Sequence, residues 1–452
     1  MKIKLIPLLT SRSLSAAIFG LCCLLLVGAL SPAPAQSLGP YDRDNARSVL
    51  DSIKDDIRKN YYDPNFRGIN LDEHFKHYDA QLKQAQTRDH LTLIMAQALL
   101  DFDDSHTFLR PPSRAADIRY GWIMQIIGDG CFVTAVQAKS DAEAKGLKVG
   151  DAILAVDGFR PTRENIWKML YRYYAVAPAR SIRLVVQSPG DAQPRQLDVA
   201  SKIERRTAAI QWEEYGFRDA RQGFEEERDR FHEVGADLLI WRMPYFYASE
   251  EHIDGIISKA RKFKTLIVDL RSNSGGSSKV LERVLGSLFD HDVTVANIKG
   301  RKEKDNKPSI AKTRGERSFK GKVIVLVDSD SGSAAEMMAR VIQLEKRGAI
   351  LGDKTAGKVT GAKHFDYQAG NGDLYFYGAS ITVIDVIMGD GKSLEKVGVT
   401  PDELLVPASA DLAAGRDPLL SRAASLAGVQ LTSEEAGKLF PILRKSFYAG
   451  QQ

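Results

Sequence analysis

The spacing of apolar residues changes along the chain, and the first pattern is that of a helical module. Within residues 41–117, Val49, Ile53 and Ile57 recur at the spacing of a helix that buries one face. The run from Leu91 to Leu100 is apolar and rich in leucine and alanine, which is typical of a second, more deeply buried helix. We therefore predict an N-terminal helical module over residues 41–117.

Residues 118–202 have a different pattern, in which short apolar runs alternate with glycine-containing turns. The runs cover residues 131–136, 152–156 and 182–187, and one stretch of helical periodicity, residues 163–174, lies between them. Short runs bounded by glycines are typical of strands in a small sheet. This segment is predicted to be a β-rich domain with one helix.

Beyond residue 235, long apolar runs alternate with amphipathic stretches. The continuous runs at 238–243, 265–269 and 323–327 are typical of strands that are buried on both faces. Alternation of such strands with helices predicts an α/β domain over residues 236–452. The preceding residues, 203–235, are densely charged and are predicted to be a solvated linker.

The first 35 residues have the pattern of a signal peptide. An uncharged apolar run over residues 16–30 follows three basic residues, Lys2, Lys4 and Arg12. The Ala-Pro-Ala of residues 33–35 then offers a cleavage site. The run is short for a membrane span, so an uncleaved anchor is the less favoured alternative. We expect an exported protein that has no stable membrane span after cleavage.

The composition is that of a soluble globular protein, with 44% hydrophobic and 27% charged residues. Of three cysteines only Cys131 lies beyond the signal segment, so no intramolecular disulfide is expected. Removing residues 1–35 lowers the formal net charge from +5 to +2, which gives no reason to expect a nucleic-acid partner. The eight histidines form no His-x-x-x-His pair and no cysteine cluster exists, so neither a metal nor a cofactor is expected.

The strongest chemical motif is a turn of small residues between a strand and a helix. The apolar run at 323–327 leads into this turn, and Ser333 stands where the helix begins. A serine at a helix N-terminus meets partial positive charge and free N–H groups, which favour an incipient anion. Ser333 is therefore the candidate nucleophile and Ser331 the second candidate. The alternative is that these serines only cap the helix.

Two further loops carry candidate catalytic groups. Gly275 and Gly276 follow the strand at 265–269, and with Ala334 they could direct backbone N–H groups at an oxyanion. Lys358, on a loop of glycine and alanine, could act as a general base if burial lowers its pKa. Taken singly, each loop also fits an ordinary glycine turn or a solvated lysine.

Taken together, these motifs resemble those of the carboxyl-terminal processing (tail-specific) serine proteases. Residues 270–276 are similar to that family's Leu-Arg-x-Asn-x-Gly-Gly loop, Ser333 falls on its nucleophile, and Lys358 lies 25 residues further on, where the family has its lysine. Residues 391–402 are similar to its closing motif. The resemblance implies a crotonase-like α/β protease core with a Ser333–Lys358 dyad.

One position departs from the family pattern. The family's glutamine four residues after the lysine is Ala362 here, so the group that would orient Lys358 is missing. The related tricorn-type proteases use a Ser-His pair and a distant glutamate, and Ser105, His106 and Glu395 stand at similar places. Imidazole is an easier base than lysine near neutral pH. Both bases stay open, and the spacing favours Lys358.

The β-rich segment resembles the PDZ domain of exported proteases through its residues 146–158. PDZ domains bind a peptide as an extra strand and hold its terminal carboxylate with backbone N–H groups. The resemblance implies substrates with apolar C-terminal tails, although a purely structural domain is the alternative. It places the ligand-binding loop at Tyr120, Gly121, Trp122 and Ile123.

These features lead us to expect an exported serine endopeptidase, periplasmic or extracellular, that cleaves proteins near their C-termini. Ser333 would form an acyl-enzyme while the PDZ-like domain binds the substrate's tail. The main alternative is a non-catalytic peptide-binding or chaperone-like relative of the same fold, and a lipid-binding relative would instead have a wide apolar cavity. The sequence specifies no oligomeric state.

Overall fold

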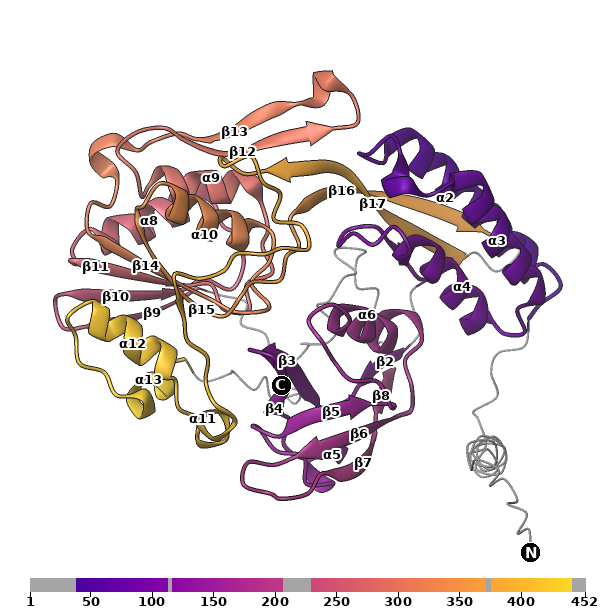
Figure 1. Cartoon of the computed structure of the whole chain (residues 1–452), viewed down its shortest axis with the longest axis horizontal. Coiled ribbons are helices and arrows are strands. Elements are labelled where there is room, and N and C mark those ends of the chain that lie inside the picture. The colour runs from indigo at the N-terminus through magenta and orange to yellow at the C-terminus, as the bar shows by residue number, and fades with distance from the viewer. Residues whose placement is uncertain (1–37, 113–115, 206–228, 371–374, 441–452) are drawn as a thin grey trace, which may run out of the picture.

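The computed structural model of the chain describes residues 38–112, 116–205, 229–370 and 375–440. The predicted signal segment and residues 206–228 of the predicted linker lie outside this described part. Among the described helices, none is long and apolar enough to cross a membrane. Figure 1 shows the N-terminal helices in indigo, a β-rich module in purple and magenta, and an α/β domain in pink, orange and yellow.

The N-terminal segment is helical, as its periodicity predicts. The buried face of its first helix includes Val49, Ile53 and Ile57, because these residues recur once per turn. Thr87 caps the last of these helices through a side-chain oxygen that accepts the His90 N–H. The described helices are α2 (Asp42–Asn60), α3 (Leu71–Gln84) and α4 (Arg88–Leu100).

The core of these helices is completed by residues from the far end of the chain. A long antiparallel hairpin, β16 (Thr360–Ala369) and β17 (Tyr375–Ile387), reaches from the α/β domain to α2 (Figure 1). Ala379 and Ile381 of β17 belong to the same buried cluster as Ile53. The short strand β1 (Phe108–Arg110) pairs with β17 and so continues the helical module directly into the hairpin.

The β-rich module is an antiparallel sheet in the order β3-β4-β5-β6-β7. Trp122, Met124 and Ile126 alternate along β3 and are buried in the module's core, together with Cys131. β3 stands at the end of the strand order, beside the short helix α6 (Ile166–Tyr171). The strands are β3 (Trp122–Ile127), β4 (Gly130–Val136), β5 (Ala152–Val156), β6 (Ser181–Gln187) and β7 (Arg195–Ala200), and a separate pair joins β2 (Ala116–Arg119) to β8 (Lys202–Arg205).

The α/β domain is built on a six-stranded sheet in the order β18-β15-β14-β11-β10-β9. All neighbouring pairs are parallel except β9, which runs antiparallel at the edge. The sheet strands are β9 (Arg230–Val234), β10 (Leu238–Arg242), β11 (Thr265–Asp269), β14 (Lys322–Val327), β15 (Gly348–Gly352) and β18 (Glu403–Leu404).

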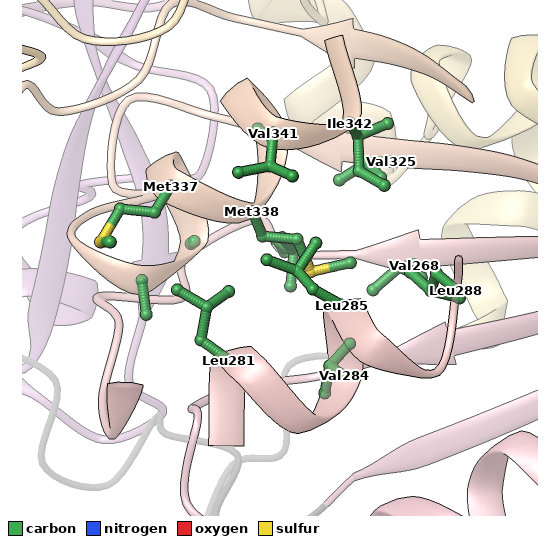
Figure 2. Packing of buried hydrophobic residues seen from close by; sticks show 14 of the residues in the cluster. Val268, Leu281, Val284, Leu285, Leu288, Val325, Met337, Met338, Val341 and Ile342 are labelled. Carbon is green, nitrogen blue, oxygen red and sulfur yellow. The ribbon is translucent and has the colours of Figure 1, made fainter. Parts of the chain in front are cut away.

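Helices cover both faces of this sheet, which explains why its central strands are continuously apolar. One face is packed by α8 (Glu250–Ala260), α9 (Ser278–Gly286) and α10 (Ala334–Leu344). Figure 2 shows Leu281 and Leu285 of α9 in one cluster with Met338 of α10 and with Val268 and Val325 of the sheet. The other face is packed by α12 (Pro418–Leu426) and α13 (Ser433–Leu439).

Two segments differ from their prediction. Strand β9 begins at Arg230, inside the stretch predicted to be a linker, because Phe231 stacks on Trp241 of the next strand and anchors an otherwise polar edge. Residues 299–318, rich in lysine, arginine and glycine, are predicted from the sequence to be a charged surface loop, but they include β13 (Lys307–Ala311), which forms an antiparallel hairpin with β12 (Val293–Gly300). β9 and β13 are edge strands, whose solvent-facing charges obscured the strand pattern.

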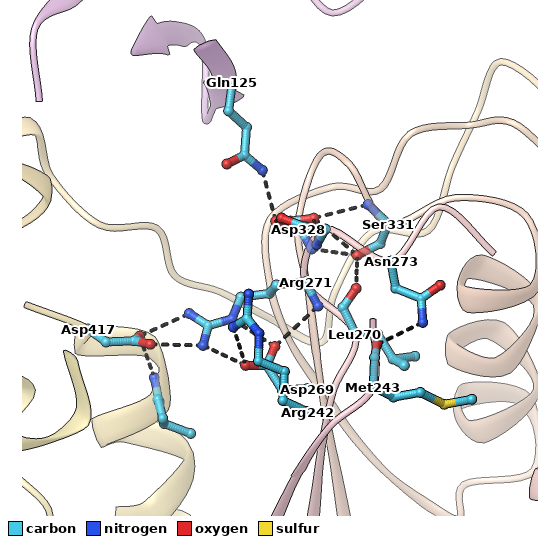
Figure 3. Close-up of polar contacts among 12 residues, drawn as sticks. Gln125, Arg242, Met243, Asp269, Leu270, Arg271, Asn273, Asp328, Ser331 and Asp417 are labelled. Atoms are coloured by element: carbon cyan, nitrogen blue, oxygen red, sulfur yellow. Dashed lines mark hydrogen bonds and ion pairs between the residues drawn. The ribbon is translucent and has the colours of Figure 1, made fainter. Parts of the chain in front are cut away.

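An ion cluster at the carboxyl end of β11 fixes the start of the glycine loop (Figure 3). Asp269 has no exposed surface and accepts hydrogen bonds from Arg271 and Arg242. Burial alone would raise the pKa of Asp269, but the two guanidinium groups hold it at about 2. Arg271 also forms a bidentate pair with Asp417, which accepts the Leu420 N–H as the N-cap of α12.

We expect Asp417→Ala to lower the free energy of unfolding by about 3 kcal/mol, because it removes a helix cap and half of the charge that compensates a largely buried guanidinium. Denaturant unfolding at neutral pH measures this loss. The matched control is Glu403→Ala, which breaks the exposed pair with Arg422 and should leave the free energy of unfolding nearly unchanged. Equal losses in the two variants would contradict the expectation.

Candidate active site

Ser333 stands at the junction of β14 and α10 in a strained conformation. Its backbone has φ of 50° and ψ of −116°, a combination that costs free energy for any residue except glycine. The side chain is half-buried and lines a cleft. Ser331, the second candidate nucleophile, is fully buried, and its hydroxyl donates to the Leu270 carbonyl. Ser331 therefore supports the turn.

A buried carboxylate holds in place the turn that carries the candidate nucleophile, called here the nucleophile turn. Glu336, one turn into α10, accepts the N–H groups of Ser333 (3.1 Å), Gly357 (2.7 Å) and Lys358 (2.8 Å), and also the Thr355 hydroxyl (2.6 Å). Burial raises the pKa of Glu336 to about 7, while the donors favour its charged form. This group ties the nucleophile helix to the lysine loop.

The glycine loop presses directly against Ser333. A β-carbon on Gly275 would lie 2.6 Å from that of Ser333, so only glycine fits there. The Gly275 N–H is already used, because it donates to Asn273 Oδ1 at 2.8 Å. Gly276 pairs with Phe246 in a parallel bridge, and the hydrogen bonds of this bridge join Phe246 to Gly275 and Ser277. The Gly276 N–H therefore points away from Phe246.

Two N–H groups beside the nucleophile are left without an acceptor among the described residues: those of Gly276 and of Ala334, the first residue of α10. The Ala334 N–H is one of the unsatisfied donors with which every helix begins. Two such donors near one serine are what an oxyanion site requires.

His106 is held by a chain of hydrogen bonds that ends in a carboxylate. Its Nδ1 lies 2.7 Å from Ser105 Oγ and 2.8 Å from Thr360 Oγ1. Ser105 in turn donates both its hydroxyl (2.8 Å) and its N–H (2.7 Å) to Glu395. Since the Ser105 proton points to Glu395, its oxygen accepts from Nδ1–H, and the lone pair of His106 is on Nε2.

The surroundings of His106 favour its neutral form. Burial lowers its pKa to about 4, and the nearby Lys358 ammonium and His364 act in the same direction, while Asp104 opposes them. Burial also raises the pKa of Glu395, against the hydrogen bonds from Ser105 that favour its charged form. His106 is therefore an unprotonated imidazole at neutral pH and can accept a proton.

Lys358 is close to the nucleophile through its backbone. Its carbonyl accepts the Ser333 N–H at 3.1 Å, and its side chain lines the same cleft as Ser333 and His106. In the described residues no hydrogen bond joins the Ser333 hydroxyl to either candidate base. Ala362 lies on β16 opposite Thr382, and His364, two residues further, reaches the cleft.

A cleft of about 410 Å³ brings most of the predicted residues together. Tyr120 is instead a core residue, and its hydroxyl accepts the Ala179 N–H. Glu395 lies behind Ser105, while Thr360 and Asn273 are supporting residues that sequence reasoning missed. Those lining the cleft are Ser105, His106, Trp122, Ile123, Gly275, Gly276, Ser333 and Lys358.

We expect Glu336→Gln to lower the free energy of unfolding by about 3 kcal/mol, because the amide NH₂ would face hydrogen-bond donors in a fully buried site. Thermal or denaturant unfolding at pH 8 measures the change. Glu345→Gln makes the same substitution at the exposed end of the same helix and should leave stability nearly unchanged. A Glu336→Gln protein as stable as this control would show that the buried carboxylate does not hold the turn.

Two protein-family models match parts of the chain. Residues 237–405 match the family model described as Peptidase family S41, and residues 42–99 match that of the tricorn protease C1 domain. The first match covers both loops that carry Ser333 and Lys358, and the second covers most of the N-terminal helices.

Individual relatives are distant but extend over much of the chain. It is 22% identical over 354 residues to a carboxyl-terminal-processing protease of Picosynechococcus sp., covering 74% of this chain and 79% of that protein. It is 24% identical over 316 residues to the tail-specific protease of Haemophilus influenzae, covering 63% of this chain and 41% of that protein.

The solved structure of mature CPAF shares the fold, with a TM-score of 0.62 and 16% identity over 82% of this chain and 94% of that one. Residues 237–405 thus match peptidase family S41, and the chain is a serine-type peptidase that is similar to the carboxyl-terminal-processing and tail-specific proteases.

Proposed function

We propose that the chain is an exported serine endopeptidase that cleaves proteins near their C-termini through Ser333, with His106 as the general base. The observation that carries the proposal is the chain Glu395–Ser105–His106, which fixes the imidazole in the tautomer that can accept the serine proton. Export rests on the pattern of residues 1–35, which lie outside the described residues.

The reaction is acyl transfer in two stages. Ser333 Oγ attacks the scissile carbonyl carbon while its proton passes to His106 Nε2, and the Gly276 and Ala334 N–H groups stabilise the oxyanion. The imidazolium then protonates the leaving amine as the C–N bond breaks. Water attacks the acyl-enzyme, gives its proton to His106, and releases the new carboxyl terminus as the serine is reprotonated.

Two observations favour His106 over Lys358, which the spacing alone had favoured. His106 has hydrogen-bonded partners on its far side that orient it, whereas the family's orienting glutamine is Ala362 in this chain. The low pKa of His106 also keeps it in the unprotonated form that a general base needs at neutral pH. Lys358 then acts as a fixed cation that helps to keep His106 unprotonated.

The β-rich module supplies the proposed binding site for the substrate's tail, as a PDZ-like domain beside a crotonase-like core. β3 is an edge strand and α6 lies beside it, the arrangement in which a peptide adds as an extra strand. Trp122 and Met124 of β3 and Trp167 and Leu170 of α6 line the same cleft as Ser333. These side chains are apolar or aromatic, which supports a preference for apolar tails.

The base is tested by fluorophosphonate labelling and by cleavage of peptides with apolar C-termini. Ser333→Ala should abolish both. His106→Ala should lower kcat/KM by roughly 10²–10⁴, because it removes general-base catalysis. Lys358→Met, which keeps the length of the side chain without its charge, should retain most activity.

The pH profile gives an independent check on the base. The acid limb of kcat/KM should lie near pH 4, since His106 must be neutral to act, and Lys358→Met should move this limb to higher pH. A dead Lys358→Met protein beside an active His106→Ala protein would assign the base to the lysine. If the wild-type protein neither reacts with the fluorophosphonate nor cleaves the peptides, the non-catalytic, peptide-binding alternative is favoured.

The proposed site for the substrate's tail is tested by placing a negative charge in the cleft. Leu170→Glu should raise KM for apolar-tailed peptides roughly tenfold or more, because a carboxylate would be desolvated against the tail, and should leave hydrolysis of a small ester unchanged. Leu154→Glu makes the same change on an exposed position of β5 outside the cleft and should have no effect. Equal KM values for the two variants would place the tail elsewhere.

A further inference from the structure

A second carboxylate, Asp104, lies directly before the Ser105–His106 pair. It stands in the turn between α4 and β1 and has only 1% of its surface exposed. Its Oδ1 accepts the N–H groups of His106 (2.9 Å) and Thr107 (2.6 Å). These two bonds fix the backbone from which the imidazole projects.

Three hydroxyl groups complete the shell of donors around Asp104. The Tyr61 hydroxyl donates to Oδ2 at 2.7 Å, the Thr107 hydroxyl donates to Oδ2 at 2.9 Å, and the Thr382 hydroxyl donates to Oδ1 at 2.7 Å. Tyr61 is the C-cap of α2 and Thr382 belongs to β17. The carboxylate therefore receives hydrogen bonds from three separate elements.

This arrangement exceeds what a turn requires. An aspartate that only shapes a turn needs the local N–H groups, which here are those of His106 and Thr107. The Tyr61 and Thr382 donors come from residues 43 and 278 positions away. A carboxylate held from several directions cannot rotate, so the peptide that carries His106 is fixed relative to both the helices and the hairpin.

The charges around His106 give Asp104 a second effect. Lys358 and His364 face the imidazole and disfavour its protonated form, and Glu395 acts on it only through Ser105. Asp104 is the anion that opposes these cations. During catalysis His106 must take up a proton in a buried place, and a nearby fixed negative charge stabilises that imidazolium.

We propose that Asp104 is a positioning residue for His106: it anchors the Ser105–His106 turn to α2 and β17 and supplies the negative charge against which the imidazole takes up the serine proton. The proposal rests on the proposed function, because it needs His106 to be the base. It adds to that function a residue outside the Glu395–Ser105–His106 chain. It also gives the N-terminal helices a part in catalysis, through Tyr61.

Asp104→Asn is the principal test, with kcat and KM measured across pH on the whole protein. We expect kcat to fall on the order of 10- to 100-fold, with KM little changed, because the base is misplaced while the substrate groove is intact. The acid limb of kcat/KM should move to lower pH, since the variant loses the charge that raises the pKa of His106. A purely structural role would not move this limb.

Asp103→Asn is the matched control. Asp103 is the adjacent carboxylate, it is exposed, and it pairs with Lys396 and Lys168 on the surface. Asparagine tolerates its positive φ of 49°. This variant should keep both the rate and the acid limb of the wild type. An Asp104→Asn profile identical to that of Asp103→Asn would overturn the proposal.

Tyr61→Phe provides a second test in case the Asp104→Asn protein does not fold. It removes one donor and leaves the carboxylate charge in place, so kcat should fall by less and the acid limb should stay where it is. An unchanged kcat in Tyr61→Phe would show that the N-terminal helices have no part in positioning His106.

Direct NMR titration of the His106 ring in a Ser333→Ala background separates this proposal from the proposed function. A lower His106 pKa in Asp104→Asn than in Asp103→Asn supports the electrostatic part whether or not His106 is the base. An unchanged His106 pKa overturns that part. If His106→Ala stays fully active, the proposed function fails, and the role of Asp104 in catalysis fails with it.

Discussion

The catalytic region depends on the buried carboxylate of Glu336. It binds the Ser333 N–H on one side and the Gly357 and Lys358 N–H groups on the other, so the nucleophile helix and the loop after β15 cannot move apart. That loop is in turn bonded to the segment around Glu395, because Gly357 accepts the Lys396 N–H. Ser333 and the groups that orient His106, the proposed nucleophile and base, are thus joined in one hydrogen-bonded frame.

The β-rich module is attached to this frame at the nucleophile turn. Gln125 of β3 donates to Asp328, and the same carboxylate accepts the Ser272 and Ser331 N–H groups (Figure 3). Arg163, next to α6, donates through Nη2 to both carboxylate oxygens of Asp353. The edge strand that would receive a peptide is therefore bonded to both the nucleophile turn and the glycine loop.

The features that the sequence predicted are those with a local signal. Continuous apolar runs predicted the central strands, and a small-residue turn predicted the place of Ser333 at the start of a helix. The edge strand β9 and the β12–β13 hairpin were missed, because their exposed charges mask a strand pattern. The partners of His106 were harder still. Thr360 reaches His106, and Thr382 reaches Asp104, only when distant segments of the chain come together. These contacts leave no regular spacing in the sequence. The spacing therefore favoured Lys358, whereas the assembled geometry favours His106.

The pairing of β1 with β17 determines when the active site can form during synthesis. Ser105 and Glu395 are 290 residues apart, and the strand that follows His106 finds its partner only at residues 378–380. A ribosome delivers the histidine early but its orienting carboxylate near the end. The proposed base and the carboxylate that orients it therefore come together only after almost all of the chain has been made.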